Sequence, residues 1–482
     1  MNWVWNKVSM NGKERLKSML LGFLVICSLV LGGKIWTQKK LWPDGYNFFY
    51  SIKKSPIVRR LTDRKASPYT KTHIALPDRI IINTGYQTTR FLLNSTHEQF
   101  KMANDIAYEA LAAAFSADSK NISEASSDEW YNTLTSRSVY LSYDINYSSD
   151  IMPEFFGCSG SAISGFTDII SDVVISGGDM GVSVIFKNGS SNRYYRVNAV
   201  DFDRSGIDEL IVYFQDKFDE NDTSSSTIIN YSFDLLFDKA KESQRVIISP
   251  MVPIFNNPVE YETINSENPT ARSDGTHNSQ TVKELLDIFD INSNTMRKYT
   301  EADGTSVFVE NDMILKLSPG GYLTYTSKNP QRSILKRNAG SVYDAVSMVS
   351  EFTDRINDIS GSNKDLYISS DLTDMDYAKS KITFDYIVNG IPVTMTETEH
   401  AVEVFVENGY ITEYRQILRR YENTSVITST PMYISAIDSV SDNGSENKYT
   451  VVEKMYVSYF DDLSIGEKTA DWRLITSELE RS

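Results

Sequence analysis

The sequence predicts an α+β protein in which a single N-terminal transmembrane helix precedes a multi-domain extracytoplasmic body of mainly antiparallel sheets with packed helices. Three observations lead to this prediction. Residues 16–36 form one apolar stretch. The rest of the chain mixes segments that alternate with period two and segments with helical periodicity. Two Asn-Gly pairs, at 389–390 and 408–409, separate alternating segments in the way that antiparallel hairpins require.

The apolar stretch at 16–36 is long enough to cross a bilayer. No charged side chain interrupts it from Met19 to Gly33. As a helix rising about 1.5 Å per residue it covers roughly 30 Å, the thickness of the hydrocarbon core. A cleaved signal peptide and a buried core helix are the competing interpretations, but the residues around Gly33 offer a poor small-residue cleavage site. We therefore expect an uncleaved anchor.

The lengths of chain on the two sides of this span predict its orientation. Lysine and arginine counts near the two ends are almost equal, so the positive-inside rule does not decide it. A short head at 1–15 and one large remainder most simply leave the head in the cytoplasm and export the rest. The expected location is the cell membrane, with a single span, a cytoplasmic N-terminus and the body on the extracellular side.

Small residues of the span predict where a partner helix would lie. Helices in lipid associate by close backbone approach at small residues and by packing. At about 100° per residue, five positions fall on one stripe of the helix. They are Ser18, Gly22, Ile26, Leu29 and Gly33. The competing interpretation is that glycine is simply common in transmembrane helices.

A basic collar follows the span and could lie on anionic lipid headgroups of the bilayer. Its members are Lys39, Lys40, Lys53, Lys54, Arg59 and Arg60. A solvated surface of the first domain explains these charges equally well.

Charge and cysteine content limit the partners and the compartment. The formal net charge is −16, and residues 1–40 carry seven Lys or Arg against Glu14, so the remainder is near −22. Such a charge argues against nucleic acid as a partner. The only cysteines are Cys27, inside the span, and Cys158, so no disulfide forms within the exported part. An extracellular body without disulfides is typical of a Gram-positive bacterium, which has one membrane.

We divide the body into three parts: an N-terminal extracytoplasmic α+β domain at 37–260, a middle α+β module at 281–335, and a C-terminal propeptide-like α+β domain at 336–482. The first begins with two apolar strands within 78–93, followed by helices at 100–114 and 128–134. Further strands are expected at 138–147, 166–176, 181–186, 193–199 and 208–214. In the later parts, Thr281 with Glu284 and Ser341 with Asp344 are expected to cap two helices.

The order of several weak signals resembles one known family. They are Trp42-Pro43-Asp44 beside the span, Asp128-Glu129-Trp130 before an apolar strand, the run ELLDIFDINSNTMRKYTEADGTSVFVENDMILKLSPGGYLTYT at 284–326, the helix and hairpins of 341–421, and a tail with YVSYFDD and ADWRLI within 456–475. This order resembles the YycH/YycI family, whose members are accessory membrane regulators of the WalK (YycG) sensor histidine kinase. Insertions around 219–227 and 262–280 depart from the family pattern.

The resemblance implies a fold, a function and partners. It implies one span, an extracytoplasmic α+β body and a role in tuning a kinase that controls cell-wall metabolism. The implied partners are a membrane sensor histidine kinase of the WalK (YycG) type and a YycI-like accessory protein. No catalytic residue, cofactor or metal ligand is expected from it.

Three short patterns in the sequence are typical of serine enzymes. Ser333 and Lys336 fit S-x-x-K, Ser441 begins an S-D-N, and Lys468-Thr469 begins a K-T-G that Ala470 does not complete. Ser333 lies in a linker after Pro330 and Ser441 in a turn-like segment, so neither opens an apolar helix. A peptidoglycan-active serine enzyme is therefore a remote alternative.

Metal-binding patterns are equally weak. Asp201-Phe202-Asp203 begins a calcium-type loop, but its twelfth position is Val212 in place of the required glutamate. The four histidines, His73, His97, His277 and His400, form no H-E-x-x-H motif. The sequence thus favours a non-enzymatic, single-pass membrane regulator of a WalK-type kinase. The alternative is an extracytoplasmic peptide-binding or peptidase-inhibiting module.

Overall fold

A computed structural model describes residues 76–85, 89–95, 97, 99–178, 181–199, 202–219, 227–235, 246–272, 276–329, 341–373, 375–376, 378–441 and 448–480. All described residues belong to one compact unit, Lys71–Ser482. The predicted span at 16–36 lies outside them. None of the helices in the described ranges combines the length and the apolar character that crossing a bilayer requires.

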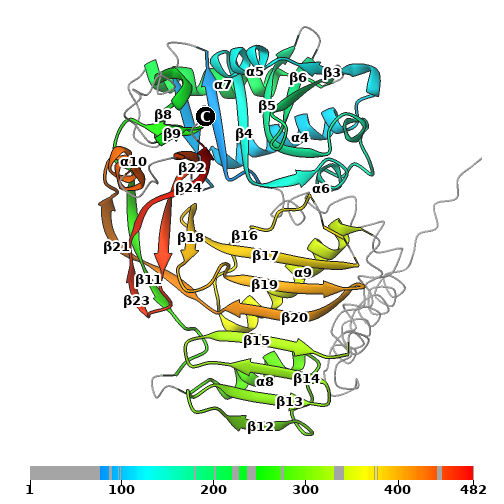
Figure 1. Ribbon diagram of the computed structural model, residues 1–482, viewed down its shortest axis with the longest axis vertical. Helices are drawn as coiled ribbons and strands as arrows, with labels where there is room; N and C mark the ends of the chain where they lie inside the picture. The colour runs from blue at the N-terminus through cyan, green and yellow to red at the C-terminus, as the bar shows by residue number, and fades with distance from the viewer. Residues whose placement is uncertain are drawn as a thin grey trace, which may run out of the picture. The chain divides into compact units, whose positions relative to one another are not determined.

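The described part of the chain is a mixed α+β structure dominated by antiparallel sheets (Figure 1), as the sequence predicted. Seven α-helices occur within it. They are α4 (Phe100–Phe115), α5 (Ser127–Thr135), α6 (Met152–Phe155), α7 (Ser205–Asp219), α8 (Ser279–Ile288), α9 (Val342–Ser360) and α10 (Tyr433–Ser441). Short 3-10 turns, η4 (Ser119–Asn121), η5 (Ala162–Gly165) and η6 (Ser232–Leu235), complete the helical segments.

The first sheet has nine strands, all paired antiparallel. In spatial order they are β10 (Pro253–Phe255), β8 (Thr227–Tyr231), β2 (Arg90–Leu93), β1 (Arg79–Thr84), β4 (Arg137–Ser148), β5 (Ile169–Gly178), β6 (Gly181–Asn188), β7 (Arg193–Ala199) and β3 (Ile122–Ala125). Helices cover both faces of this sheet, so strand β1 is buried along its whole length. Because side chains alternate along a strand, Ile80 and Ile82 belong to one core cluster and Ile81 to the other.

Helix α7 replaces the strand that we predicted at 208–214, so that prediction was wrong. Its buried residues, Ile207, Leu210, Ile211 and Phe214, recur at helical spacing and join the same core cluster as Ile80. Asp203 stabilises the start of the helix because its carboxylate accepts hydrogen bonds from the Ser205 backbone N–H, at 3.0 Å, and from the Ser205 hydroxyl, at 2.8 Å.

The second sheet has twelve strands. Ten follow one path: β12 (Arg297–Thr300), β13 (Ser306–Glu310), β14 (Met313–Leu317), β15 (Tyr322–Ser327), β20 (Tyr410–Ile417), β19 (Val402–Glu407), β17 (Lys379–Val388), β18 (Ile391–Met395), β22 (Lys448–Asp461) and β24 (Ala470–Glu480). Strands β16 (Leu366–Ile368) and β9 (Val246–Ile248) pair with β17 and β22 respectively. Strand β22 pairs in parallel with β18 and with β9.

Both predicted Asn-Gly hairpins are present. Strands β17 and β18 turn at Asn389-Gly390, and β19 and β20 turn at Asn408-Gly409. All four turn residues have positive φ, 51° and 71° in the first turn and 52° and 79° in the second. Asparagine and glycine tolerate this conformation, and it matches the twist of the flanking strands.

Helices α8 and α9 pack on the second sheet through an aromatic cluster. The ring of Phe289 stacks on Tyr325 of β15, with a centroid distance of 4.8 Å, and lies 5.3 Å from Phe352 of α9. The predicted cap of α9 is confirmed, since the Ser341 hydroxyl accepts a hydrogen bond from the Asp344 N–H at 3.2 Å. Helix α8 instead begins after Asn278, whose side chain accepts from the Gln280 N–H, rather than at Thr281.

A third sheet has three strands, in the order β21 (Arg420–Ser429), β11 (Glu260–Glu267) and β23 (Gly466–Lys468). Figure 1 shows β21 as its outer strand, with β11 and β23 beside it. The divisions that we predicted at 260, 281 and 335 stay predictions.

Candidate functional site

The partner-binding and lipid-binding residues predicted from the sequence lie outside the described residues. These are Ser18, Gly22, Ile26, Leu29 and Gly33 of the stripe and Lys39, Lys40, Lys53, Lys54, Arg59 and Arg60 of the collar. Both sets therefore stay predictions.

The residues of the serine-enzyme patterns do not assemble a catalytic site among the described residues. Ser333 and Lys336 fall outside the described residues, and Ser441 is the last residue of α10. The ammonium group of Lys468 is largely buried and donates to the side chains of Asp462 and Ser464. This engagement leaves Lys468 in no position to act as a base toward a substrate.

A serine, a histidine and an aspartate that no sequence motif connects lie together beside β17. The Ser369 hydroxyl is 3.1 Å from Nδ1 of His400, and Oδ2 of Asp385 is 2.9 Å from the same nitrogen. The other carboxylate oxygen of Asp385 accepts the backbone N–H of Ala401 at 2.7 Å. In a catalytic triad the serine and the aspartate face opposite nitrogens of the imidazole. Because both contact Nδ1 here, this geometry tethers the segment before β19 and does not activate a nucleophile.

Metal ligands do not assemble in the part of the chain that the structure describes. No group of three His, Cys, Asp or Glu side chains there could hold an ion. Asp203, from the calcium-type pattern, serves α7, and the hydrogen bonds from Ser205 hold the pKa of its carboxyl below the usual value. His97, His277 and His400 lie on separate segments, and His73 is outside the described residues.

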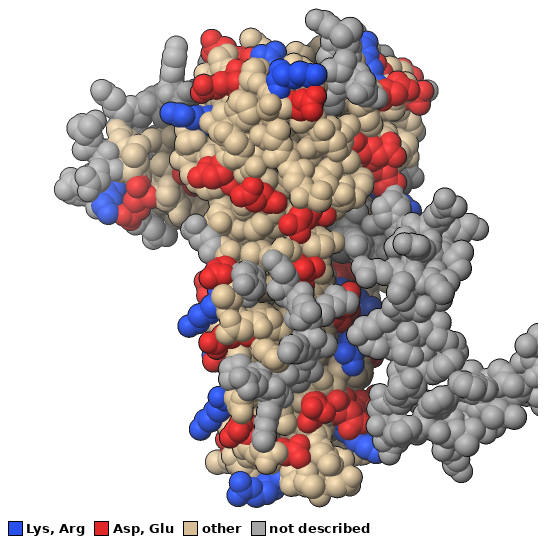
Figure 2. All heavy atoms as spheres, turned by 90° about the vertical axis from the view of Figure 1, so that its right-hand side faces the viewer, with Lys and Arg blue, Asp and Glu red and all other residues tan. Residues whose placement is uncertain are grey.

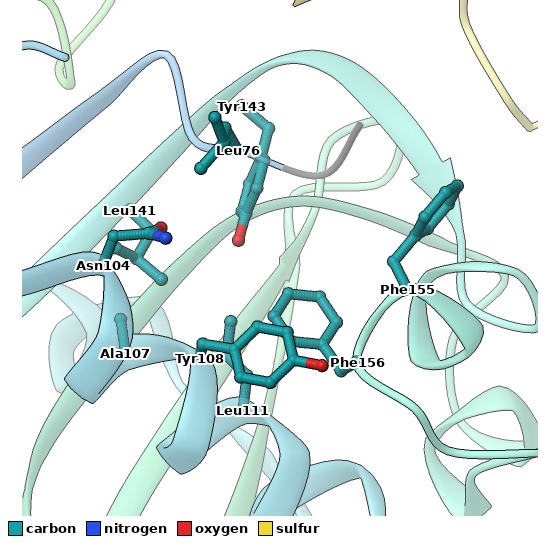
Figure 3. Close-up of a pocket in the computed structure, with 9 residues that line it drawn as sticks. All are labelled: Leu76, Asn104, Ala107, Tyr108, Leu111, Leu141, Tyr143, Phe155 and Phe156. Carbon is teal, nitrogen blue, oxygen red and sulfur yellow. The ribbon is translucent and has the colours of Figure 1, made fainter. Parts of the chain in front are cut away.

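A small apolar pocket lies between α4, β4 and α6 (Figure 3). It contains about 290 Å³ of empty space, part of it open to solvent. Its lining is formed by Leu76, Asn104, Ala107, Tyr108, Leu111, Leu141, Tyr143, Phe155 and Phe156. The enclosed part of this space is about 10 Å³, room for about one water molecule and far below the roughly 300 to 1,000 Å³ of small-molecule sites.

The polar groups of this pocket are all uncharged at neutral pH. Figure 3 shows the Asn104 amide and the Tyr143 hydroxyl directed into the space between the helix and the strand. Burial raises the pKa of Tyr143 well above its ordinary value, and burial followed by the neighbouring Cys158 raises that of Tyr108. With so little enclosed space and only neutral polar groups, the pocket is a gap in the packing rather than a site for a ligand.

The pocket adjoins contacts between the first sheet and α9. The ring of Phe155, which lines the pocket, meets Tyr343 edge-on with a centroid distance of 5.0 Å. Next to it, the hydroxyl of Ser341 donates to Glu154 at 3.2 Å. These contacts connect α6 to the start of α9.

The two large sheets are also tied through β4 and β22. The ammonium group of Lys454 donates to the backbone carbonyl of Asp144 at 2.6 Å, and it lies 3.4 Å from the Asp144 carboxylate. On the first sheet, Asn146 Nδ2 donates to Asp371 at 3.2 Å and the Asn146 carbonyl accepts from Leu372 at 3.0 Å.

Acidic side chains dominate the visible charge of the body. On the face in Figure 2, Asp and Glu cover more of the described surface than Lys and Arg do. This agrees with the net charge of −16 for the whole chain. A polyanion such as nucleic acid would be repelled by such a face.

Comparison with known proteins identifies the fold. No family model matches the sequence, and no curated protein matches it. Among solved structures, the crystal structure of YycH from Bacillus subtilis is similar to this chain with a TM-score of 0.50 and 10% sequence identity. The similarity covers 81% of this chain and 92% of that chain. The chain therefore has a YycH-like fold, as its order of sequence features suggested.

Proposed function

We propose that this protein is a non-enzymatic, single-pass membrane accessory protein that regulates a WalK (YycG)-type sensor histidine kinase controlling cell-wall metabolism. The observation that carries the proposal is the YycH-like fold, which extends over 92% of the YycH chain. The order of sequence signals from Trp42-Pro43-Asp44 to the segment at 456–475 supports it independently, because it resembles the YycH/YycI family along nearly the whole chain.

The proposal includes a membrane location with the N-terminus in the cytoplasm and the body outside. Its support is the uncharged stretch from Met19 to Gly33. A kinase in the same membrane is then within reach of the stripe, of the basic collar and of the body. A YycI-like protein is a second proposed partner.

Regulation without chemistry requires only differential affinity. If the protein binds one conformation of the kinase more tightly than the other, it shifts the kinase equilibrium toward the preferred conformation. A tenfold preference corresponds to about 1.4 kcal/mol, which is enough to change a balanced equilibrium substantially. The engaged state of Lys468 and of the Ser369, His400 and Asp385 group favours such a binding role over a catalytic one.

In-membrane crosslinking tests the proposal. A photoreactive residue placed in the stripe at Ile26 of the full-length protein should capture the WalK-type kinase, identified by mass spectrometry. Gly22→Leu and Gly33→Leu should each weaken both the crosslink and the regulation, because they separate the two helices. Leu24→Ile, on another face of the helix, is the matched control and should change neither.

Two outcomes distinguish the parts of this proposal. Equal crosslinking by all three variants, at normal membrane abundance, would assign recognition to the body rather than to the span. Failure to capture the kinase from any position in the span or in the body would contradict regulation by direct binding.

A further inference from the structure

Most edges of the described sheets carry features that prevent pairing with another strand. Natural proteins protect such edges with charged residues, proline or short length. The protecting residues here are Arg297 and Lys298 in β12, Glu124 in β3, Pro253 in β10, Glu467 in β23 and Glu478 in β24. The remaining edge strands β9 and β16 have three residues each.

Strand β21 lacks this protection in its second half. It is an outer strand of the three-stranded sheet and pairs only with β11 in the part of the chain that is described. From Asn423 to Ile437 the sequence has no charged residue, although 23% of the whole chain is charged. Within this stretch, residues 424–429 include the β-branched residues Thr424, Val426, Ile427 and Thr428, which favour extended structure.

Two consecutive apolar side chains of β21 are exposed. Ile427 is 73% exposed, the highest value among the large hydrophobic residues described, and Val426 is 53% exposed. Neighbouring side chains of a strand point to opposite faces. Both faces of this end of β21 are therefore open, in addition to its edge.

Backbone hydrogen-bonding groups also face outward along this edge. The N–H of Thr430 donates to the Val259 carbonyl at 2.9 Å, so Thr430 faces β11. Backbone groups alternate in direction along an antiparallel strand. Thr428, which lies opposite Tyr261, consequently faces β11 as well, and the N–H and C=O groups of Ile427 and Ser429 face away from it.

Hydrogen bonds hold the first half of β21 in place and so fix the position of its outward edge. The hydroxyl of Tyr421 donates to the buried Asp461 at 2.9 Å, and its N–H donates to the Asn363 side chain at 2.9 Å. At the bulge that follows, the N–H of Ser425 donates to Glu262 at 2.7 Å. A preorganised edge lowers the entropy cost of binding an extended segment.

We propose that the end of β21, residues 426–429, is a strand-addition site for an extended peptide segment of another protein. The proposed partner segment has an uncharged, β-branched centre and basic residues at its ends. In this mode, main-chain hydrogen bonds to Ile427 and Ser429 supply affinity, and the exposed side chains select the partner. The inference does not depend on the proposed regulation of a kinase.

The charges around this edge define the basic ends of the partner. Glu260 and Glu262 of β11 lie opposite Ser429 and Ile427, and Glu422 precedes the uncharged stretch. The guanidinium of Arg420 is already paired with Glu267 and with Glu422. A second copy of this chain would bring the same glutamates to the contact and be repelled, whereas lysine or arginine at the ends of a partner strand would be attracted.

Hydrogen exchange on the full-length protein in detergent micelles tests this site. The probe is a synthetic peptide of alternating valine and threonine with lysines at both ends. We expect it to slow amide exchange at 427–429. A version with N-methylated backbone amides, or with glutamates in place of the lysines, should bind at least about tenfold more weakly, because it loses strand pairing or charge complementarity.

Substitutions on the protein complete the test. Ile427→Lys places a charge on the edge and should weaken the peptide by at least about tenfold. Val212→Lys, at an exposed position of α7, is the matched control and should leave binding unchanged. Absence of protection at 427–429 with the lysine-flanked peptide would overturn the proposal. So would equal weakening by both substitutions, or protection that appears without peptide as the protein concentration rises, which would indicate a second copy.

Discussion

Arg419 and Asp461 form an ion pair from which solvent is excluded. Nε of Arg419 lies 3.3 Å from Oδ2 of Asp461, and neither side chain has any exposed surface. The guanidinium also donates to the carbonyl oxygens of Gly320 and Leu463, each at 2.7 Å. The pair thus joins the start of β21, the end of β22 and the turn before β15, three segments that are distant in sequence.

Loss of this ion pair should destabilise the body strongly. Asp461→Asn keeps the shape of the side chain but leaves the positive charge of Arg419 buried without its partner. Removing one member of a buried pair costs about 3–5 kcal/mol of unfolding free energy, and we expect a loss of that size in urea titrations. Glu478→Gln, which removes an exposed partner of Lys448, is the control and should cost about 0–1 kcal/mol. Equal small losses in both variants would contradict the structural role of Asp461.

Asp172 should make the stability of the first sheet depend on pH. Burial alone would raise the pKa of this carboxyl, but the Lys187 ammonium and hydrogen bonds from Tyr140, at 2.7 Å, and Ser171, at 2.9 Å, outweigh it and hold the pKa below 3.8. A lowered native pKa contributes stability above the unfolded value, and this stability is lost as the pH falls toward the native value.

The matching experiment compares urea unfolding at neutral pH with unfolding at successively lower pH around and below 3.8. The parent protein should lose more stability over this interval than Asp172→Asn does, because the variant has no carboxylate there to protonate. Asp216→Asn, on the exposed side of α7, controls for the loss of one negative charge. Identical pH profiles of the parent and Asp172→Asn would refute the assignment.

The Ser369, His400 and Asp385 group should be dispensable for function. Because Ser369 and Asp385 both contact Nδ1 of His400, Ser369 is not placed to be activated as a nucleophile. Ser369→Ala should therefore keep full regulation of the kinase, measured as kinase phosphorylation in cells. Loss of regulation by a folded Ser369→Ala protein at normal abundance would reopen the enzymatic alternative.

Thiol labelling can test the proposed orientation in the membrane. Ser191 is exposed in the turn between β6 and β7, so Ser191→Cys in a Cys158→Ser background should react with an impermeant maleimide on intact cells. Reaction only after lysis would place the body inside and contradict the topology. Cys158→Ser alone reports any background from Cys27.

Local sequence signals predicted the local elements well. The turns at Asn389-Gly390 and Asn408-Gly409 and the cap at Ser341 depend on a few adjacent residues, and each formed as expected. Helix α7 was missed because its run of β-branched and aromatic residues suggested a strand. The buried positions from Ile207 to Phe214 nevertheless recur at helical spacing, a signal already present in the sequence.

Contacts between distant segments had no comparable signal. The parallel pairing of β9 with β22, the ion pair of Arg419 with Asp461 and the approach of Ser369 to His400 all depend on how the sheets fold together. The exposed edge of β21 is of the same kind, since the sequence around Val426 and Ile427 does not show that these side chains are exposed. Periodicity predicts which residues are apolar along a segment, but not what covers them.

Reconstitution of the full-length protein with a purified WalK-type kinase in lipid vesicles tests the central claim most directly. The measurement is the rate of kinase autophosphorylation with and without the protein at matched kinase density. We predict a severalfold change in this rate, which Gly22→Leu and Gly33→Leu reduce and Leu24→Ile preserves. An unchanged rate, with both proteins inserted in the same vesicles, would contradict the proposal that this protein regulates the kinase by binding it.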